Sequence, residues 1–177
     1  MPMPDTRRGG PSVWKSKSEP ASFEHSLVIG AAPQRVLDAF FDPADLVVWW
    51  RPSRSVTTPR LFGAYALQWV TSDYHDEVLG PLGGTFHGTV VEYKAGREFL
   101  VTDAFWLPPE GDPIGPMALE VVCESHESER ALQPATLLRV AQKGYEESER
   151  WTRYYDILGI GLRRSLETLK LHLEQNG

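Results

Sequence analysis

The stretch VIGAAPQRVLDAFFDPADLVVWW, residues 28–50, carries the clearest signals for local structure in this 177-residue chain. Its first three residues, 28–30, are the end of an extended segment. Pro33 suits the first turn of a helix, where a missing N–H costs nothing. Asp42 and Pro43 then supply an N-cap and a first helical residue for a second helix. Pro52 disfavours helical geometry in the residue before it, so the second helix must be short. The order predicted here is strand, helix, short helix.

Outside this stretch, apolar and polar residues alternate in several short segments. Alternation with a period of two is typical of strands that bury one face. No helical pattern separates the later segments, which favours an antiparallel meander. The expected strands span residues 23–30, 64–70, 85–93, 97–106, 117–124 and 136–142.

The C-terminal part predicts one long helix, because apolar residues recur there every three or four positions. Gly159 and Gly161 interrupt this pattern. Close contact between the helix and a sheet is the favoured reason for glycine at these positions, and a kink or hinge is the alternative. The apolar stripe begins soon after Ser148 and consists of Trp151, Tyr155, Leu158, Leu162, Leu166, Leu169 and Leu173.

Three segments resemble one protein family. Residues 28–50 resemble the opening of the family named after the activator of Hsp90 ATPase, a branch of the START-like superfamily. The segments GGTFHGTVVEYKAGREFLVT (83–102) and GLRRSLETLKLHLE (161–174) resemble the glycine-led hairpin and the closing helix of that family. The resemblance covers residues 23–175. It implies an α+β helix-grip START-like fold, with a curved antiparallel sheet wrapped around a long C-terminal helix and two short helices after the first strand.

The family name does not imply an activity, because one fold can host many unrelated functions. The Hsp90 activator also has another domain, which binds the chaperone, and this chain shows no counterpart of that domain or its motif. The domain organisation expected is therefore a tail at residues 1–22 followed by one START-like domain at residues 23–175.

In this fold the long helix and the sheet enclose a cavity, which bears on the adjacent tryptophans at positions 49 and 50. Neighbouring helical residues point about 100° apart, so one flat apolar face cannot bury both rings. Leu46 lies one turn before Trp49, which favours Trp49 as the anchor to the core and Trp50 as the residue at the cavity mouth. The residues expected to bind a ligand are Trp50, Tyr65, Trp69, His87, Phe105, Trp151 and Tyr155.

Charge and composition narrow the function classes. The chain carries a formal net charge of −6; its Pro-, Gly- and Ser-rich tail, which we predict to be disordered, carries +2 and leaves −8 on the rest. Such a body repels nucleic acid and anionic membranes. The single cysteine, Cys123, excludes an internal disulfide, and no apolar run has the length of a membrane span or the context of a signal peptide. We expect a cytoplasmic protein without membrane insertion.

The remaining candidates for chemistry are weaker. Asp73, His75, Asp76 and Glu77 are residue types that bind metals or transfer protons, but a polar, exposed loop with solvated carboxylates is the expected setting. Cys123 is expected to be a small buried hydrophobe without a neighbouring base. We therefore assign no catalytic residue, no metal and no cofactor.

Asp103 has the same parity as Phe99, Val101 and Phe105 in one expected strand. If this face points inward, Asp103 is a buried acid that needs a partner, and Arg139 on a nearby strand could serve. If both residues lie on the outer face, no partner is needed. The outer position is the simpler interpretation.

Three function classes stay open. The first is a binding module for a small, largely apolar ligand; the second is a protein-interaction module, either chaperone-linked or homodimeric; the third is an enzyme of the cyclase or hydrolase type. Inward polar groups within reach of one another would favour an enzyme. An apolar cavity would favour a binding module, and an exposed apolar patch would favour an interaction module. The proline-rich connection WLPPEGDPIGPM (106–117) is expected to be a hairpin loop, a lid or a subunit contact.

Overall fold

A computed structural model describes residues 21–127 and 132–176. The predicted tail, residues 1–22, lies outside the described residues except for its last two positions. Seven strands form one antiparallel sheet in the order β1-β9-β8-β7-β6-β3-β2. Their bounds are Phe23–Ile29 (β1), Arg54–Thr57 (β2), Ala64–Trp69 (β3), Gly84–Lys94 (β6), Glu98–Leu107 (β7), Ile114–His126 (β8) and Ala135–Lys143 (β9).

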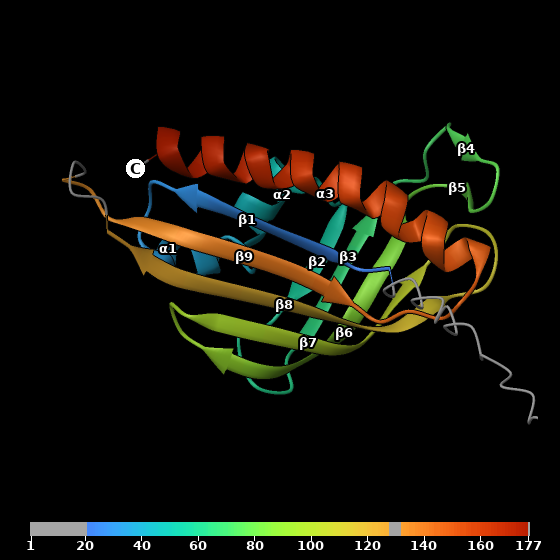
Figure 1. Ribbon diagram of the computed structural model, residues 1–177, viewed down its shortest axis with the longest axis horizontal. Helices are drawn as coiled ribbons and strands as arrows, with labels where there is room; N and C mark the ends of the chain where they lie inside the picture. The colour runs from blue at the N-terminus through green and yellow to red at the C-terminus, as the bar shows by residue number, and fades with distance from the viewer. Residues whose placement is uncertain (1–20, 128–131, 177) are drawn as a thin grey trace, which may run out of the picture.

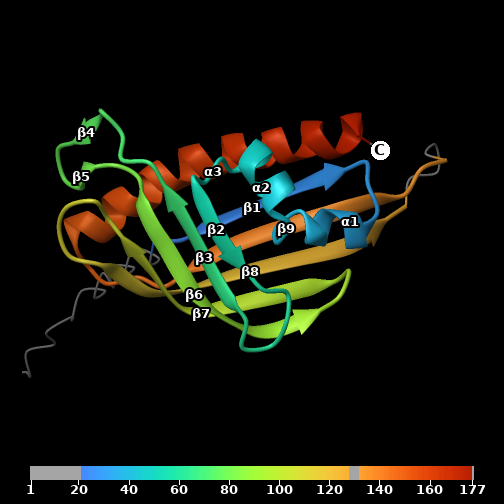
Figure 2. The ribbon, with the colours of Figure 1, turned by 180° about the vertical axis from the view of Figure 1, so that it is seen from behind.

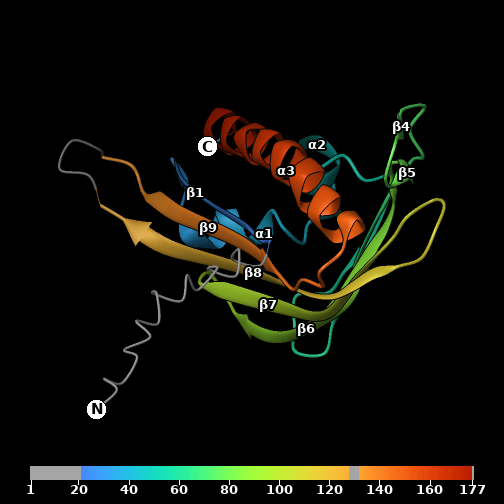
Figure 3. The same cartoon turned by 45° about the vertical axis from the view of Figure 1, so that its right-hand side comes forward.

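Three helices cover one face of this sheet. The sheet is curved, and α3 (Glu149–Gln175) lies across its concave side (Figure 1, Figure 3). Helix α2 (Pro43–Trp49) packs against α3, and α1 (Pro33–Asp38) packs against β8 and β9 (Figure 2). The predicted α+β helix-grip fold is therefore confirmed. None of the described helices is long and apolar enough to cross a membrane.

The two short helices begin where the prolines predict. The Asp42 side chain caps α2, because its Oδ1 accepts a hydrogen bond from the Ala44 amide at 2.9 Å. The helix ends at Trp49, and Arg51 adopts the left-handed conformation with φ 58°. The amide of Arg51 donates to the carbonyl of Leu46 at 2.9 Å, which closes the last turn.

Strand β7 contains a bulge that the sequence does not reveal. Val101 pairs with Leu119, but the next pair on the inner face joins Ala104 to Met117, so β7 has one residue more than its partner strand over this interval. Asp103 lies in the bulge with φ 47°. Because the extra residue shifts the alternation, inward and outward positions exchange beyond it.

The bulge decides which way three residues at the end of β7 face, and it corrects the expectation that Phe105 lines the cavity. Phe105 faces outward and Trp106 is buried, the reverse of the predicted alternation, while Asp103 is exposed on the outer face. Gly88 on the neighbouring strand makes room for the bulge, because a Cβ at that position would lie 2.6 Å from Cγ1 of Val101. The bulge thus turns the Trp106 indole toward α3.

The outer face also holds Arg139, whose Nη2 lies 3.8 Å from Oε1 of Glu124. The buried Asp103–Arg139 pair is therefore not formed, and the simpler interpretation of the two residues holds. Cys123 is buried, as predicted, and desolvation raises the pKa of its thiol to about 12. The thiol stays protonated at neutral pH, which makes it a poor nucleophile.

Residues 72–77 form part of a small hairpin, β4 (His75–Asp76) and β5 (Gly80–Pro81). Asp76 is only 4% exposed, so the expectation of a solvated carboxylate is wrong for this residue. Its Oδ1 lies 2.7 Å from Nη2 of Arg153 on α3, and its Oδ2 accepts hydrogen bonds from the amides of Val78 and Leu79. The Arg153 hydrogen bond lowers the pKa of Asp76, and the pair fastens the hairpin to α3.

The connection between β7 and β8 is a hairpin loop at residues 108–113, because β8 already begins at Ile114. The Nη2 of Arg150 donates to the carbonyl of Asp112 at 2.8 Å and thereby joins the loop to the first turn of α3.

The glycines of α3 are not explained by close packing, which corrects the expectation from the sequence. A Cβ at Gly159 would meet Phe23 at an ordinary 3.9 Å, and a Cβ at Gly161 would meet nothing within 4 Å. The helix accepts about 1 kcal/mol per glycine relative to alanine without a steric need at either position.

One buried carboxylate joins all three helices. Asp45 on α2 accepts two hydrogen bonds from the Arg35 guanidinium on α1, at 2.6 and 2.8 Å. Its Oδ1 also lies 2.8 Å from Nε2 of His172 on α3. The Arg35 hydrogen bond is the main cause of the lowered pKa of Asp45.

Candidate functional site

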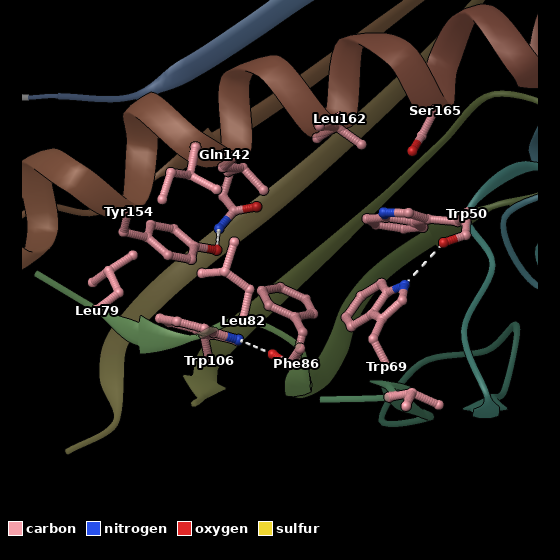
Figure 4. A pocket seen from close by; sticks show the side chains of 15 residues that line it. Trp50, Trp69, Leu79, Leu82, Phe86, Trp106, Gln142, Tyr154, Leu162 and Ser165 are labelled. Atoms are coloured by element: carbon pink, nitrogen blue, oxygen red, sulfur yellow. Dashed lines mark hydrogen bonds between the residues drawn. The ribbon is translucent and has the colours of Figure 1, made fainter. Parts of the chain in front are cut away.

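A pocket of about 360 Å³ lies between α3 and the concave side of the sheet (Figure 4). It is open to solvent on one side and is closed by the end of α2, by β3, β6, β7 and β9, and by the hairpin after Ser72. The residues that line it are Trp50, Trp69, Val70, Leu79, Leu82, Gly83, Phe86, Trp106, Gln142, Tyr154, Ile157, Leu158, Gly161, Leu162 and Ser165.

The two adjacent tryptophans have different surroundings. Trp49 is 1% exposed, and its Nε1 donates to the carbonyl of Ala39 at 2.8 Å. Trp50 is half-buried and lines the pocket, with its ring stacked on that of Trp49 at a centroid distance of 4.8 Å. Trp49 is thus the anchor to the core, and Trp50 presents its other face to the pocket.

The other two tryptophans of the pocket have their polar atoms occupied. The Nε1 of Trp69 donates to the carbonyl of Trp50, and the Nε1 of Trp106 donates to the carbonyl of Gly83, both at 2.8 Å. Both indoles therefore offer the pocket only apolar surface. Together with Trp50 and Phe86 they form an aromatic wall opposite α3 (Figure 4).

Helix α3 presents a second stripe to the pocket, beside the stripe that fills the core. Tyr154, Leu158, Gly161 and Ser165 follow one another at intervals of three or four residues and so lie on one side of the helix. Gly161 adds no side chain, which keeps the space in front of it open. The glycine that packing does not explain is therefore part of the pocket wall.

The polar atoms of the pocket gather mainly at one end. Gln142 is 2% exposed, and its Nε2 donates to the hydroxyl of Tyr154 at 2.5 Å and to Sδ of Met117 at 3.1 Å. Burial raises the pKa of Tyr154 above its ordinary value, so this phenol is neutral in the physiological range. Ser165 lies at the other end, near Trp50 (Figure 4).

No side chain of Asp, Glu, Lys, Arg or His lines this pocket in the described part of the chain. Tyr154 is its one ionisable group, and that group is held neutral. A charged ligand would lose its hydration here without meeting an opposite charge, which is costly. The chemistry of the walls suits a neutral, apolar or aromatic molecule.

Two of the seven residues expected to bind a ligand, Trp50 and Trp69, line the pocket. Tyr65 does not, because it is fully buried and its hydroxyl donates to the carbonyl of Phe40 at 2.8 Å. His87 and Phe105 stack on each other on the outer side of the sheet, where the β7 bulge has turned Phe105 away from the pocket.

The last two expected residues belong to the core stripe of α3 rather than to the pocket. Trp151 and Tyr155 are buried and stack on each other, with ring centroids 6.3 Å apart. The hydroxyl of Tyr155 donates to the carbonyl of Gly144 at 2.6 Å. Both residues fix the first turns of α3 on the sheet.

Sequence reasoning missed several pocket residues for different reasons. Phe86 could have been found, since it has the parity opposite to His87 in an alternating strand. Trp106 was hidden by the bulge, and Tyr154 lies next to Tyr155, which was assigned to the apolar stripe in its place. Gln142, at the end of β9, carried no signal in the sequence.

Residues 21–127 and 132–176 contain no group of three or more His, Cys, Asp or Glu side chains placed to hold a metal ion. Within the segment that held four such residues, Asp76 is committed to its pair with Arg153. Asp76 is thus part of a structural ion pair.

Comparison with known proteins identifies the fold. No family model and no curated protein matches the sequence. The AHSA1 protein from Silicibacter pomeroyi, however, superposes with a TM-score of 0.64 at 14% identity, over 89% of this chain and 100% of that one. The chain has the fold of the Aha1-like proteins.

Other solved structures agree with this Aha1-like fold. A protein from Chromobacterium violaceum matches with a TM-score of 0.61 at 20% identity, over 87% of this chain and 97% of that one. The Aha1 dimer from Colwellia psychrerythraea matches with a TM-score of 0.56 at 15% identity, over 86% and 96% of the two chains. The resemblance noted in the sequence is confirmed at the level of the fold.

Proposed function

We propose that residues 23–175 form a single START-like domain that binds a small, neutral, apolar or aromatic ligand in the pocket between α3 and the sheet. One observation carries this proposal: the pocket has aromatic and aliphatic walls, and no acidic, basic or histidine side chain lines it. Its volume of about 360 Å³ is at the lower end of the range for small-molecule sites. A ligand of two or three rings fits these dimensions.

An enzyme is less well supported. Gln142 and Tyr154 are two inward polar groups within hydrogen-bonding distance of each other, which is the feature expected of a catalytic cavity. An amide does not titrate, however, and the raised pKa of Tyr154 makes it a poor proton donor or acceptor near neutrality. The pair suits recognition of a polar group better than proton transfer.

A protein-interaction role is the remaining alternative, in the form of a homodimer or a chaperone-linked module. An Aha1 protein from Colwellia psychrerythraea with this fold is described as a dimer. Dimerisation through an edge of the sheet is compatible with ligand binding, because the edge strands β1 and β2 contribute no residue to the pocket.

The test is a titration with 6-propionyl-2-(dimethylamino)naphthalene, a neutral dye whose emission shifts to the blue in apolar surroundings. Gly161→Leu fills the open space in front of α3 and should abolish the shift. Gly159→Ala is the matched control, because it also removes a helical glycine but lies outside the pocket lining. If the dye binds the unsubstituted protein and both variants equally, or binds none of them, this pocket is not the binding site.

A further inference from the structure

We propose that the pocket selects ligands that carry a neutral hydrogen-bond donor, such as a phenolic hydroxyl, and that the amide oxygen of Gln142 is the acceptor that sets this preference. This inference rests on the proposed function, since it names the chemical class of ligand for the same pocket.

The hydrogen bonds of Gln142 leave one of its two polar atoms free. Its Nε2 is used twice, toward Tyr154 and Met117. Its Oε1 accepts no hydrogen bond from any described residue and points into the pocket (Figure 4). This oxygen is not among the fully buried, unpaired side-chain atoms of the described residues, so it is accessible from the pocket, where water or a ligand can donate to it.

Tyr154 complements this acceptor. Its hydroxyl oxygen accepts from Gln142, while its own hydrogen is donated to no residue in the described part of the chain. A ligand hydroxyl placed at this end can therefore accept from Tyr154 and donate to Gln142. A group that only accepts, such as an ether oxygen, could form the first of these hydrogen bonds but not the second.

The rest of the pocket gives the ligand its shape and charge. The indole N–H groups of Trp69 and Trp106 are already donated to carbonyls, so the wall between the two ends offers apolar contact alone. Ser165 lies eleven residues after Tyr154, about 16 Å further along the helix axis at 1.5 Å per residue. An elongated, flat molecule with its hydroxyl at the Gln142 end matches this layout.

Three naphthalenes of nearly equal size separate the effects of hydrogen-bond donation, hydrogen-bond acceptance and charge on affinity. 2-Naphthol can donate, 2-methoxynaphthalene can only accept, and 2-naphthoate is an anion at pH 7. Dissociation constants measured by isothermal titration calorimetry should show 2-naphthol binding about three- to tenfold tighter than 2-methoxynaphthalene, the value of one hydrogen bond. 2-Naphthoate should bind weakest.

Two variants test whether Gln142 or Tyr154 causes the preference for 2-naphthol over 2-methoxynaphthalene. Gln142→Met keeps the length of the side chain but removes the acceptor, and it should bring the ratio of the first two affinities to about one. Tyr154→Phe keeps the acceptor, so it should weaken both ligands and leave the ratio unchanged. If Gln142→Met does not fold, the side-chain amide NMR signals of Gln142 in the unsubstituted protein serve instead, and they should shift more with 2-naphthol than with 2-methoxynaphthalene.

The possible failures are distinguishable. Equal affinities for 2-naphthol and 2-methoxynaphthalene, or a preference that survives in Gln142→Met, would overturn the role of Gln142 and leave the proposed function standing. Absence of binding by all three naphthalenes would overturn the proposed function itself and this inference with it.

Discussion

Replacing Trp49 and Trp50 one at a time should separate stability from ligand binding. Trp49 is almost fully buried, donates a hydrogen bond to Ala39 and packs edge-on against Phe40 at a centroid distance of 4.9 Å. Trp49→Ala should therefore cost about 4–5 kcal/mol, the upper part of the range for large buried aromatic residues. This is a large fraction of the total stability of about 5–15 kcal/mol that is typical of a domain.

Trp50→Ala should cost less, about 1–3 kcal/mol. It removes a stacking contact with Trp49 and an edge contact with Trp69, each of which contributes about 0.5–1.5 kcal/mol. The hydrogen bond from Trp69 persists, because its acceptor is the backbone carbonyl of residue 50. The dye affinity should nevertheless fall by about fivefold or more, which corresponds to about 1 kcal/mol of lost contact.

Urea unfolding followed by far-ultraviolet circular dichroism measures the loss of stability in each variant, and titration of the folded variants with the dye measures the loss of affinity. Equal losses of stability, or a larger loss for Trp50→Ala, would show that the assignment of anchor and pocket residue is wrong. Unchanged dye affinity in Trp50→Ala would show that this ring does not contact the ligand.

Three further predictions concern the framework of the pocket. Leu162→Asp puts a charge at a buried position of α3 and should prevent folding, so recovery of a soluble, cooperatively unfolding protein would contradict the placement of this helix. Gly159→Ala should raise the thermal midpoint, since a Cβ fits there and helix propensity improves by about 1 kcal/mol. Asp76→Asn should destabilise the protein at pH 7 by about 1.5–3 kcal/mol, the usual contribution of hydrogen bonds to a charged group. Because the folded pKa of Asp76 is lowered, its contribution is full above the ordinary carboxyl pKa near 4 and is lost as the pH falls through the folded value. The difference from the unsubstituted protein, measured by unfolding at several pH values, should therefore disappear in acid, and a constant difference would refute the role of the ion pair.

The sequence predicts the fold well because its signals are local. Pro33, Asp42 and Pro43 act within one turn of the helices that they begin, and the apolar stripe of α3 needs no knowledge of its partner. The same is true of the anchor role of Trp49, which follows from its spacing to Leu46.

The site is harder to predict because it depends on distant partners and on register. One extra residue at Asp103 exchanges the faces of Phe105 and Trp106, and alternation alone cannot place such a bulge. Gln142 gains its role only because Tyr154, on the helix that follows, reaches its amide. Asp45 likewise meets His172 across 127 positions of sequence.

The ring nitrogens of the tryptophans offer the most direct test of ligand binding in this pocket. The chain has six tryptophans, so a nitrogen–proton NMR spectrum should show six indole signals that single Trp→Phe variants can assign. On titration with 2-naphthol, we predict shifts for Trp50, Trp69 and Trp106, which line the pocket, and none for Trp151, which is buried in the core stripe of α3. Shifts confined to Trp151, or an unchanged spectrum at saturating ligand, would contradict the central claim that this pocket is the binding site.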